Sequence, residues 1–376
     1  MTDLLELRDK IDEIDKAIVE LFEKRMDISG QVAEYKISTG KKVFDKEREK
    51  QKIEAIKELA HGEFNKHGAK ELFQQIMAMS RKLQYQMLEK QGVTGRLPFI
   101  MVDEIEKEKV RVVFQGEEGA YSQAAMKAYF GEDTSSFHVE QWCDAMEAIA
   151  EGAADFAVLP IENSTAGRVG DMHDLLMEFE NYIVDEQTIK VEHCLMGLPN
   201  TDLTQVQTVY SHAQALMQCR PFLEEHSNWK QMALANTAAS AKKVADDKVP
   251  NQVAIASAFA ARQFGLEILA TNISSEEENA TRFIIVTNQR IFRKAANKIG
   301  ICFELPHTSG SLYNILSHFI YNNVSMTSIE SRPIPRRNWE YRFFVEFEGN
   351  LNDSAVKNAV RGIRAEAINM KILGNY

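Results

Sequence analysis

Apolar side chains recur at helical spacing through the first 90 residues, which contain almost no turn residues. Between Leu4 and Ile37 they return every three or four positions, a pattern that predicts one long amphipathic helix. The segment "TGKKVFD" breaks this pattern, and further helices are expected over Lys46–Leu59 and about Lys66–Glu89. A helix of about 34 residues is roughly 50 Å long. A domain of about 90 residues cannot cover such a helix by itself, so we expect a partner chain to pack against it.

The pattern changes after this helical region. Lys90–Val110 is rich in glycine, proline and charge, which is typical of a linker. From Arg111 to about Gln289, short apolar runs such as "RVVF", "FAVLPI", "TVYS", "VAIAS" and "RFIIV" alternate with alanine-rich stretches, as in an α/β sheet protein. The final segment reads strand, helix, strand, strand, helix, strand, which predicts a ferredoxin-like α+β sandwich. The chain is therefore expected to be multidomain, with an all-α domain over 1–92, a linker over 93–109, an α/β domain over 110–290 and an α+β domain over 297–376.

Composition narrows the possible functions. The 376 residues carry a formal net charge of −11, which argues against bulk nucleic-acid binding but leaves room for a small anion held by local Arg and Lys residues. The charged N-terminus lacks a signal core, and no run of about 18 uncharged apolar residues occurs, so we expect a cytoplasmic protein with no membrane partner. The four cysteines show no metal-binding spacing, which favours buried thiols and no metal: Cys143, Cys194, Cys219 and Cys302.

Polar residues on the predicted helices share faces in a way that suggests a site. Arg25 and Lys36 are eleven residues apart, so they return to nearly the same face. Ser80 and Gln84 are spaced i, i+4 and also share a face. Arg8 lies about 25 Å along the axis from Arg25 and on a different face, so a functional Arg8 must serve a partner's site. For each residue alone, solvated surface is the simpler alternative.

The segments "LRDKI", "EKRMDISGQVAEYK", "DKEREK" and "SRKLQ" make residues 1–90 resemble the all-helical chorismate mutase family, whose members are intertwined dimers. The resemblance implies a site made of Arg8 from the other subunit, Arg25, Lys36, Asp45, Arg48, Glu49, Ser80 and Gln84. Chorismate is a dianion that rearranges without a nucleophile or metal, so charge complementarity and a compressed conformation suffice. We assign Arg8 and Arg25 to carboxylates, which the guanidinium fork binds bidentately. Lys36 and Gln84 are assigned to the ether oxygen, and Glu49 to the ring hydroxyl.

Polar clusters follow several expected strands of the α/β region. They lie in "FQGEEGAYSQAA", "VLPIENSTAGRV", "VYSHAQALMQC" and "LANTAASAKKVA", and Thr281 and Arg282 stand at the mouth of an expected buried strand, Phe283–Val286. For any single Ser, Thr or Asn a helix N-cap is the better alternative, and His212 fits a structural role as well as a general acid. Together the clusters indicate a cleft for a polar anion, because ligands of such folds bind beyond the carboxyl ends of strands.

These motifs resemble the prephenate dehydratase family across about residues 110 to 290, which implies two α/β lobes around a cleft, like a periplasmic binding protein. The family's threonine-arginine-phenylalanine motif is Thr281 to Phe283, so the hydroxyl and guanidinium should face the cleft; the resemblance also marks Asn163, Ser211 and Gln218. Ala213 departs from the family's usual proline. Thr281 is the expected donor to the departing hydroxyl, while Arg282 either grips a carboxylate or fixes the strand mouth. The family's reaction, in which prephenate loses carbon dioxide and water to give phenylpyruvate, needs no cofactor.

The segments "TSGSLYNILSHF" and "SIESRPIPRRNWEYRFFVEFEG" resemble the ACT regulatory domain in its phenylalanine-binding form, which pairs between subunits. The effector residues that the resemblance implies are Gly310, Ser311, Leu312, Glu330, Ser331 and Arg332. Glycine at a helix start leaves backbone N–H groups free for a ligand carboxylate, although Gly310 could equally form a simple turn.

Together the three resemblances point to the bifunctional chorismate mutase and prephenate dehydratase family of phenylalanine biosynthesis. They imply the substrates chorismate and prephenate, feedback by L-phenylalanine, and a homodimer or higher homo-oligomer. The alternative is a non-catalytic amino-acid sensor with an ACT domain. No DNA-binding helix-turn-helix pattern accompanies such a sensor here, and the mutase residues would have no role in it, so the enzyme is favoured.

Overall fold

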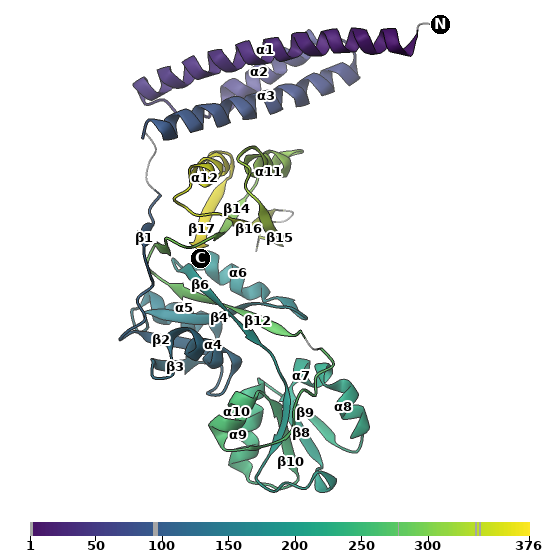
Figure 1. The fold of residues 1–376 in the computed structure, drawn as a ribbon, viewed down its shortest axis with the longest axis vertical. Coiled ribbons are helices and arrows are strands. Elements are labelled where there is room, and N and C mark those ends of the chain that lie inside the picture. Colours follow the sequence, from purple (N-terminus) through teal and green to yellow (C-terminus); the bar gives the residue numbers. More distant parts are fainter. Residues whose placement is uncertain (1–2, 93–96, 277, 335–336, 338–339) are drawn as a thin grey trace. The chain divides into compact units, whose positions relative to one another are not determined.

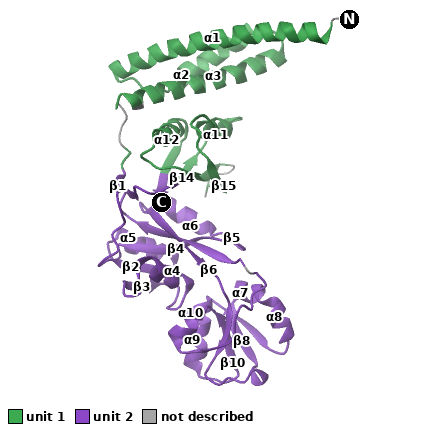
Figure 2. Ribbon diagram, viewed as in Figure 1, with its two compact units in different colours: residues 1–98, 301–371 green, residues 99–300, 372–376 purple. Residues whose placement is uncertain are grey.

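The computed structural model describes residues 3–92, 97–276, 278–334, 337 and 340–376. It divides into two compact units, one of Met1–Pro98 with Ile301–Lys371 and the other of Phe99–Gly300 with Ile372–Tyr376 (Figure 2). We describe each unit by itself.

The first unit opens with the three predicted helices, α1 (Leu4–Thr39), α2 (Lys46–Leu59) and α3 (Glu63–Lys90), and both α1 and α2 pack on α3 (Figure 1). Asp3 caps α1 by accepting a hydrogen bond from the Leu5 amide, and the helix ends at Gly40 with a φ of 67°. Asp45 caps α2 by accepting from the Arg48 amide. The three helices are confirmed, with ends within three residues of those expected.

The apolar face that predicted α1 is left largely uncovered within this chain. Its buried residues are Ser29 and Ala33, whereas its large apolar residues are more than one third exposed: Leu4, Leu5, Leu7, Ile11, Ile14, Ile18, Val19, Leu21, Ile28 and Val32. Ile53, Ile56 and Met77 form the small core between α2 and α3. An apolar face of this extent on one helix is typical of a protein interaction surface.

The C-terminal segment of the chain alternates strands and helices in the predicted order. Its elements are β14 (Lys298–Glu304), α11 (Ser311–Tyr321), β15 (Met326–Pro333), β16 (Tyr341–Glu348), α12 (Ser354–Glu366) and β17 (Asn369–Asn375). The strands are ordered β15-β16-β14-β17. Helices α11 and α12 pack together, and a Cβ atom at Gly362 would overlap the ring of His318, so the absence of a side chain there permits their close approach.

The second unit contains one α/β lobe built on the sheet segment β6-β12-β4-β2-β3. The strands are β2 (Arg111–Gln115), β3 (Ser135–Val139), β4 (Phe156–Asn163), β6 (Tyr182–Lys190) and β12 (Ala280–Thr287), and the helices are α4 (Tyr121–Phe130), α5 (Trp142–Ala150) and α6 (Gly170–Glu178). Strands β2, β3 and β4 are parallel, and β12 runs antiparallel between β4 and β6. Phe114, Met126, Val158 and Ile285 belong to its core.

A second lobe of the same unit has the strand order β11-β7-β10-β8-β9. Its strands are β7 (Cys194–Gly197), β8 (Thr208–His212), β9 (Lys230–Leu234), β10 (Gln252–Ala256) and β11 (Glu267–Ala270), and its helices are α7 (Ala213–Gln218), α8 (Arg220–Glu225), α9 (Thr237–Asp247) and α10 (Ala258–Phe264). Strands β8, β9 and β10 are parallel. The predicted pair of α/β lobes is therefore confirmed.

Three expectations need correction. A strand, β1 (Ile100–Val102), lies inside the expected linker and pairs with β13 (Ile291–Arg293). Thr281 and Arg282 lie within β12, which begins at Ala280, rather than at the mouth of a strand over Phe283–Val286, because the pairing with β4 and β6 extends to them. Cys143 is only half-buried, whereas the other three cysteines are buried.

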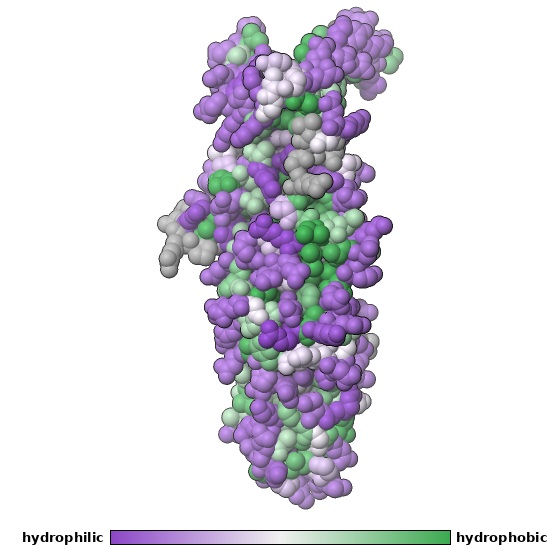
Figure 3. All heavy atoms as spheres, turned by 90° about the vertical axis from the view of Figure 1, so that its left-hand side faces the viewer, coloured by the Kyte–Doolittle hydropathy of each residue, from purple (hydrophilic) through white to green (hydrophobic). Residues whose placement is uncertain are grey.

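The surface and composition of the described residues set further limits. Hydrophilic side chains predominate on the face drawn in Figure 3, with hydrophobic ones among them. Among the helices that the structure describes, none combines the length and apolarity needed to cross a membrane. The same residues contain no group of three or more His, Cys, Asp or Glu side chains placed to hold a metal ion.

Candidate active sites

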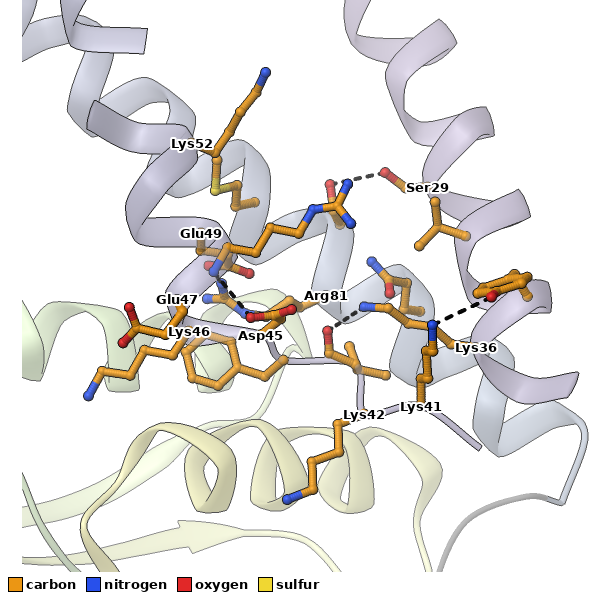
Figure 4. A pocket seen from close by; sticks show the side chains of 18 of the residues that line it. Ser29, Lys36, Lys41, Lys42, Asp45, Lys46, Glu47, Glu49, Lys52 and Arg81 are labelled. Atoms are coloured by element: carbon orange, nitrogen blue, oxygen red, sulfur yellow. Dashed lines mark hydrogen bonds and ion pairs between the residues drawn. The ribbon is translucent and has the colours of Figure 1, made fainter. Parts of the chain in front are cut away.

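Helices α1, α2 and α3 enclose a pocket of about 830 Å³. Seven of the eight predicted mutase residues line it: Arg25, Lys36, Asp45, Arg48, Glu49, Ser80 and Gln84. Figure 4 shows Lys36, Asp45 and Glu49 among the pocket residues. The eighth, Arg8, is exposed on α1 and does not line it. The structure thus brings residues of three helices to one pocket, which also contains both pairs that helical spacing placed on one face, Arg25 with Lys36 and Ser80 with Gln84.

Two cations of the pocket are held in place by neighbouring oxygen atoms. Nη1 of Arg25 donates to the hydroxyl of Ser80 over 2.6 Å, and Nζ of Lys36 donates to the carbonyl of Val43 over 2.6 Å. Partial burial lowers the pKa of Arg25, and the charge of Glu49 opposes this shift. Partial burial also lowers the pKa of Lys36, and the charge of Arg48 adds to the effect. Burial therefore disfavours both positive charges, Arg48 adds to the effect at Lys36, and a bound anion would compensate for these costs.

Further polar groups complete the pocket. The side-chain oxygen of Gln84 is buried and has no hydrogen-bond partner among the described residues, so it can accept a hydrogen bond from a ligand. Asp45, in contrast, caps α2 through the Arg48 amide. Arg81 also lines the pocket and pairs with Glu49. The sequence reasoning missed Arg81, although it follows Ser80 directly in the "SRKLQ" motif.

A second constellation is a hydrogen-bond network that joins the two α/β lobes. Nδ2 of Asn163 donates to Oγ1 of Thr281 over 2.9 Å, and Oδ1 of Asn163 accepts from the hydroxyl of Thr165 over 2.8 Å. Nε2 of Gln218, on α7, donates to Oγ1 of Thr165 over 2.9 Å. The network brings together three predicted residues, Asn163, Gln218 and Thr281, from separate parts of the sequence.

His193 ends this network and was not predicted. Its Nε2 lies 2.9 Å from Oε1 of Gln218, and its Nδ1 lies 3.4 Å from the hydroxyl of Tyr121. Burial lowers the pKa of His193, while the hydrogen bond with Gln218 opposes the shift, so the imidazole is neutral at pH 7. His193 also lines a cavity of about 690 Å³ together with Asn279 and Ala280, the neighbours of Thr281. A lone histidine in "VEHCL" carries no sequence signal for this position.

Two predicted residues lie outside the network. Ser211 is fully buried and donates to the carbonyl of Ile255 over 2.7 Å. Arg282 forms ion pairs with Glu162 at 2.9 Å and Glu186 at 3.0 Å, on the strands either side of β12. This arrangement corresponds to the expected alternative in which Arg282 fixes the strand.

Two other polar residues of the second lobe act as helix caps. His212 accepts a hydrogen bond from the Gln214 amide at the start of α7. Asn236 accepts one from the Ala239 amide at the start of α9. Both contacts match the capping alternative.

The predicted effector residues lie on two elements of the C-terminal segment. Gly310 is the N-cap of α11 with a φ of 80°, and Ser311 and Leu312 form the first turn. Glu330, Ser331 and Arg332 lie on β15. Gly310 also lines a cavity of about 480 Å³. The left-handed backbone at position 310 favours glycine, and the start of α11 presents N–H groups that could donate hydrogen bonds to a carboxylate.

Comparison with known proteins identifies the regions of the chain that contain these two constellations. The prephenate dehydratase family model matches residues 112–291, and the model for type II chorismate mutase matches residues 7–85. The chain is 31% identical over 381 residues to a bifunctional chorismate mutase/prephenate dehydratase of Enterobacter agglomerans, which covers 99% of this chain and 95% of that protein.

Solved structures match the greater part of the chain. The prephenate dehydratase of Arthrobacter aurescens in complex with L-Phe is 30% identical with a TM-score of 0.66, covering 71% of this chain and 89% of that one. A structure described as a novel type of quorum quenching acylase is 30% identical with a TM-score of 0.63, covering 70% of this chain and 96% of that one. The assignment therefore rests on the relative that matches nearly the whole sequence. On that match, the chain belongs to the family of bifunctional chorismate mutase/prephenate dehydratases.

Proposed function

We propose that the pocket of α1 to α3 rearranges chorismate to prephenate, and that the network around Asn163 and Thr281 converts prephenate to phenylpyruvate, carbon dioxide and water. The observation that carries the proposal is the convergence of seven expected mutase residues on one pocket. Turnover of each substrate by the purified chain tests it. Binding of prephenate without turnover would favour the amino-acid sensor instead.

The mutase pocket suits a reaction that needs only orientation and electrostatic stabilisation. Arg25 is positioned by Ser80 and can hold one carboxylate of chorismate. Lys36 and the Nε2 group of Gln84 can donate hydrogen bonds to the ether oxygen and stabilise the charge that develops on it as its bond to carbon breaks. Glu49 accepts a hydrogen bond from the ring hydroxyl of chorismate. None of these steps needs a covalent intermediate.

A second copy of the chain would complete this site. The exposed apolar face of α1 supplies the contact surface, and Arg8 lies on that same helix, outside its own chain's pocket. We therefore assign Arg8 to the pocket of a partner copy, where it holds the second carboxylate. Burial of this face in a homodimer removes the apolar area from water.

In the dehydratase reaction, Thr281 is the proposed donor to the departing hydroxyl. Asn163 donates to the Thr281 oxygen, so the proton of the Thr281 hydroxyl is directed elsewhere. The bond between the ring and its carboxylate breaks and releases carbon dioxide, its electrons enter the ring, and the hydroxyl leaves as water with the proton of Thr281. Thr281 then regains a proton from the solvent. Arg282 holds the strands through Glu162 and Glu186 while this occurs. Aromatisation of the ring drives the reaction.

Phenylalanine is the proposed effector of the C-terminal segment, which we assign to the ACT fold. The observed strand order and the position of Gly310 at the start of α11 support this assignment. The matched structure from Arthrobacter aurescens contains L-Phe. Inhibition requires that phenylalanine bind the less active state more tightly than the active one. The domain boundaries of 1–92, 110–290 and 297–376 remain predictions.

A further inference from the structure

Arg81 is a buried cation held between carboxylates from two distant parts of the chain. It lies on α3, directly after Ser80, and its side chain is 9% exposed. Nη1 pairs with Oε2 of Glu49 on α2, and Nη2 donates to Oε1 of Glu366 on α12 over 2.8 Å. Figure 4 shows Arg81 and Glu49 together in the mutase pocket. One guanidinium thus connects the pocket to the C-terminal segment.

Glu366, the second carboxylate that pairs with Arg81, also contacts a histidine. Nε2 of His318, on α11, lies 3.0 Å from the same oxygen of Glu366. Burial alone would raise the pKa of Glu366, but the hydrogen bond from His318 and the charge of Arg81 lower it overall, so Glu366 remains a carboxylate. Burial alone would lower the pKa of Arg81, but Glu366 and Glu49 outweigh it and raise the value. The guanidinium also lies 5.0 Å from the ring centroid of Phe44.

This geometry determines where the Glu49 carboxylate can point. A guanidinium is planar and presents its donors in a fixed fork, so holding one nitrogen at Glu366 fixes the direction in which the other meets Glu49. In the proposed function, the carboxylate of Glu49 accepts a hydrogen bond from the ring hydroxyl of chorismate. A shift of about 1 Å in such a group costs up to about 10²-fold in rate.

We propose that Arg81 is a positioning residue of the mutase reaction, and that Glu366, in the C-terminal segment, helps to hold the Arg81 guanidinium in place. The inference rests on the proposed role of Glu49. It adds that the mutase pocket depends on a side chain 285 positions away from Arg81 in the sequence. The simplest competing account is a buried ion pair that stabilises the fold without affecting catalysis.

Four variants of the full-length chain separate these accounts. Arg81→Met removes the charge and keeps a long side chain, and we expect mutase kcat to fall roughly 10-fold or more while KM changes less than about threefold. Arg81→Lys keeps the charge without the fork and should recover part of the loss. Glu366→Gln should cause a smaller fall. The double variant should be no slower than Arg81→Met, because Glu366 acts through Arg81.

Matched controls address folding. Lys82 is the next residue of α3; its Nζ lies 5.7 Å from the ring centroid of Tyr321, and it does not line the mutase pocket. Lys82→Met should therefore leave mutase kcat unchanged. Dehydratase turnover is measured on every sample as a check on folding. If Arg81→Met fails to fold because the buried Glu366 loses the charge of Arg81, the double variant removes the charge of Glu366 and still tests Arg81.

Several outcomes would overturn the proposal. If Arg81→Met, or the double variant, keeps mutase kcat within about twofold while Glu49→Gln loses it, Arg81 has only a structural role. If KM rises while kcat is unchanged, Arg81 contacts chorismate directly. If the double variant is slower than Arg81→Met by the same factor that Glu366→Gln causes alone, Glu366 acts independently of Arg81. If Glu49→Gln itself leaves turnover intact, the assigned role of Glu49 is wrong, and the inference falls with it.

Discussion

Nδ2 of Asn163 lies 2.9 Å from the hydroxyl oxygen of Thr281, across the paired strands β4 and β12. The register places Thr281 opposite Asn163 and Arg282 opposite Glu162. The amide therefore uses the oxygen of Thr281 as an acceptor and leaves its proton for another partner. Arg282, one position later, is engaged by Glu162 and Glu186. Adjacent residues of one motif thus divide into a candidate donor and a strand anchor.

Thr281→Val should lower dehydratase turnover by about 10²-fold or more, the scale of general-acid assistance. Valine keeps the β-branched shape that suits a strand and removes only the hydroxyl. The KM for prephenate should change little, because the hydrogen bond matters mainly in the transition state. Formation of phenylpyruvate gives the rate. Near-normal turnover would reduce Thr281 to a strand residue and assign the proton donor to another group or to water.

His193 predicts a pH dependence of stability. Burial lowers its pKa from 6.5, so the unfolded chain binds more protons than the folded one between the lowered value and 6.5. The free energy of unfolding should therefore fall as the pH drops below 6.5, and this contribution should vanish in His193→Gln. Denaturant unfolding of both proteins between about pH 5 and pH 7.5 measures the difference.

An exposed histidine provides the control for this titration. His67 lies on α3 with a side chain that is 72% exposed, 3.2 Å from Glu71. His67→Gln should leave the pH dependence close to that of the parent, because an exposed pair contributes little. Parallel curves for the parent and His193→Gln would contradict the account of a buried neutral imidazole.

Arg8→Ala and Arg25→Ala should each inactivate the mutase, and a mixture should regain part of the activity. In a dimer with shared sites, a mixed pair contains one site free of both substitutions and one site with both. Chorismate consumption after subunit exchange measures the recovery. Absence of recovery, once exchange has been demonstrated, would place Arg8 outside the partner's site.

Gly310→Val should leave basal dehydratase turnover intact and abolish inhibition by phenylalanine. The φ of 80° at Gly310 is unfavourable for a β-branched residue, so the first turn of α11 should be displaced. Turnover measured across a phenylalanine titration tests this effect. An inhibition curve that matches the parent's would move the effector site elsewhere.

The fold could be predicted wherever periodicity was long and regular. The spacing of apolar residues from Leu4 to Ile37 predicted α1, which spans Leu4–Thr39, and the C-terminal order of strands and helices is as expected. The three-residue strand β1 is too short to show such a pattern, and the segment around it has the composition of a linker. The start of β12 was missed because two polar residues, Thr281 and Arg282, precede its apolar run.

The candidate sites could be predicted only in part, because several contacts depend on tertiary packing. Local spacing placed Arg25 and Lys36 on one face, and both line the pocket. No local pattern could join Arg81 to Glu366, since α12 must first pack near α3. Ser211 looked available after its strand, yet its hydroxyl bonds to β10 in the buried interior.

The central claim is that one chain carries two separate active sites, and a paired assay of Arg25→Ala and Thr281→Val tests it most directly. Chorismate and prephenate turnover are measured on the same preparations of both variants. The account predicts that Arg25→Ala loses mutase turnover and keeps dehydratase turnover, and that Thr281→Val does the reverse. Loss of both activities in either variant, with the fold intact, would contradict separate sites.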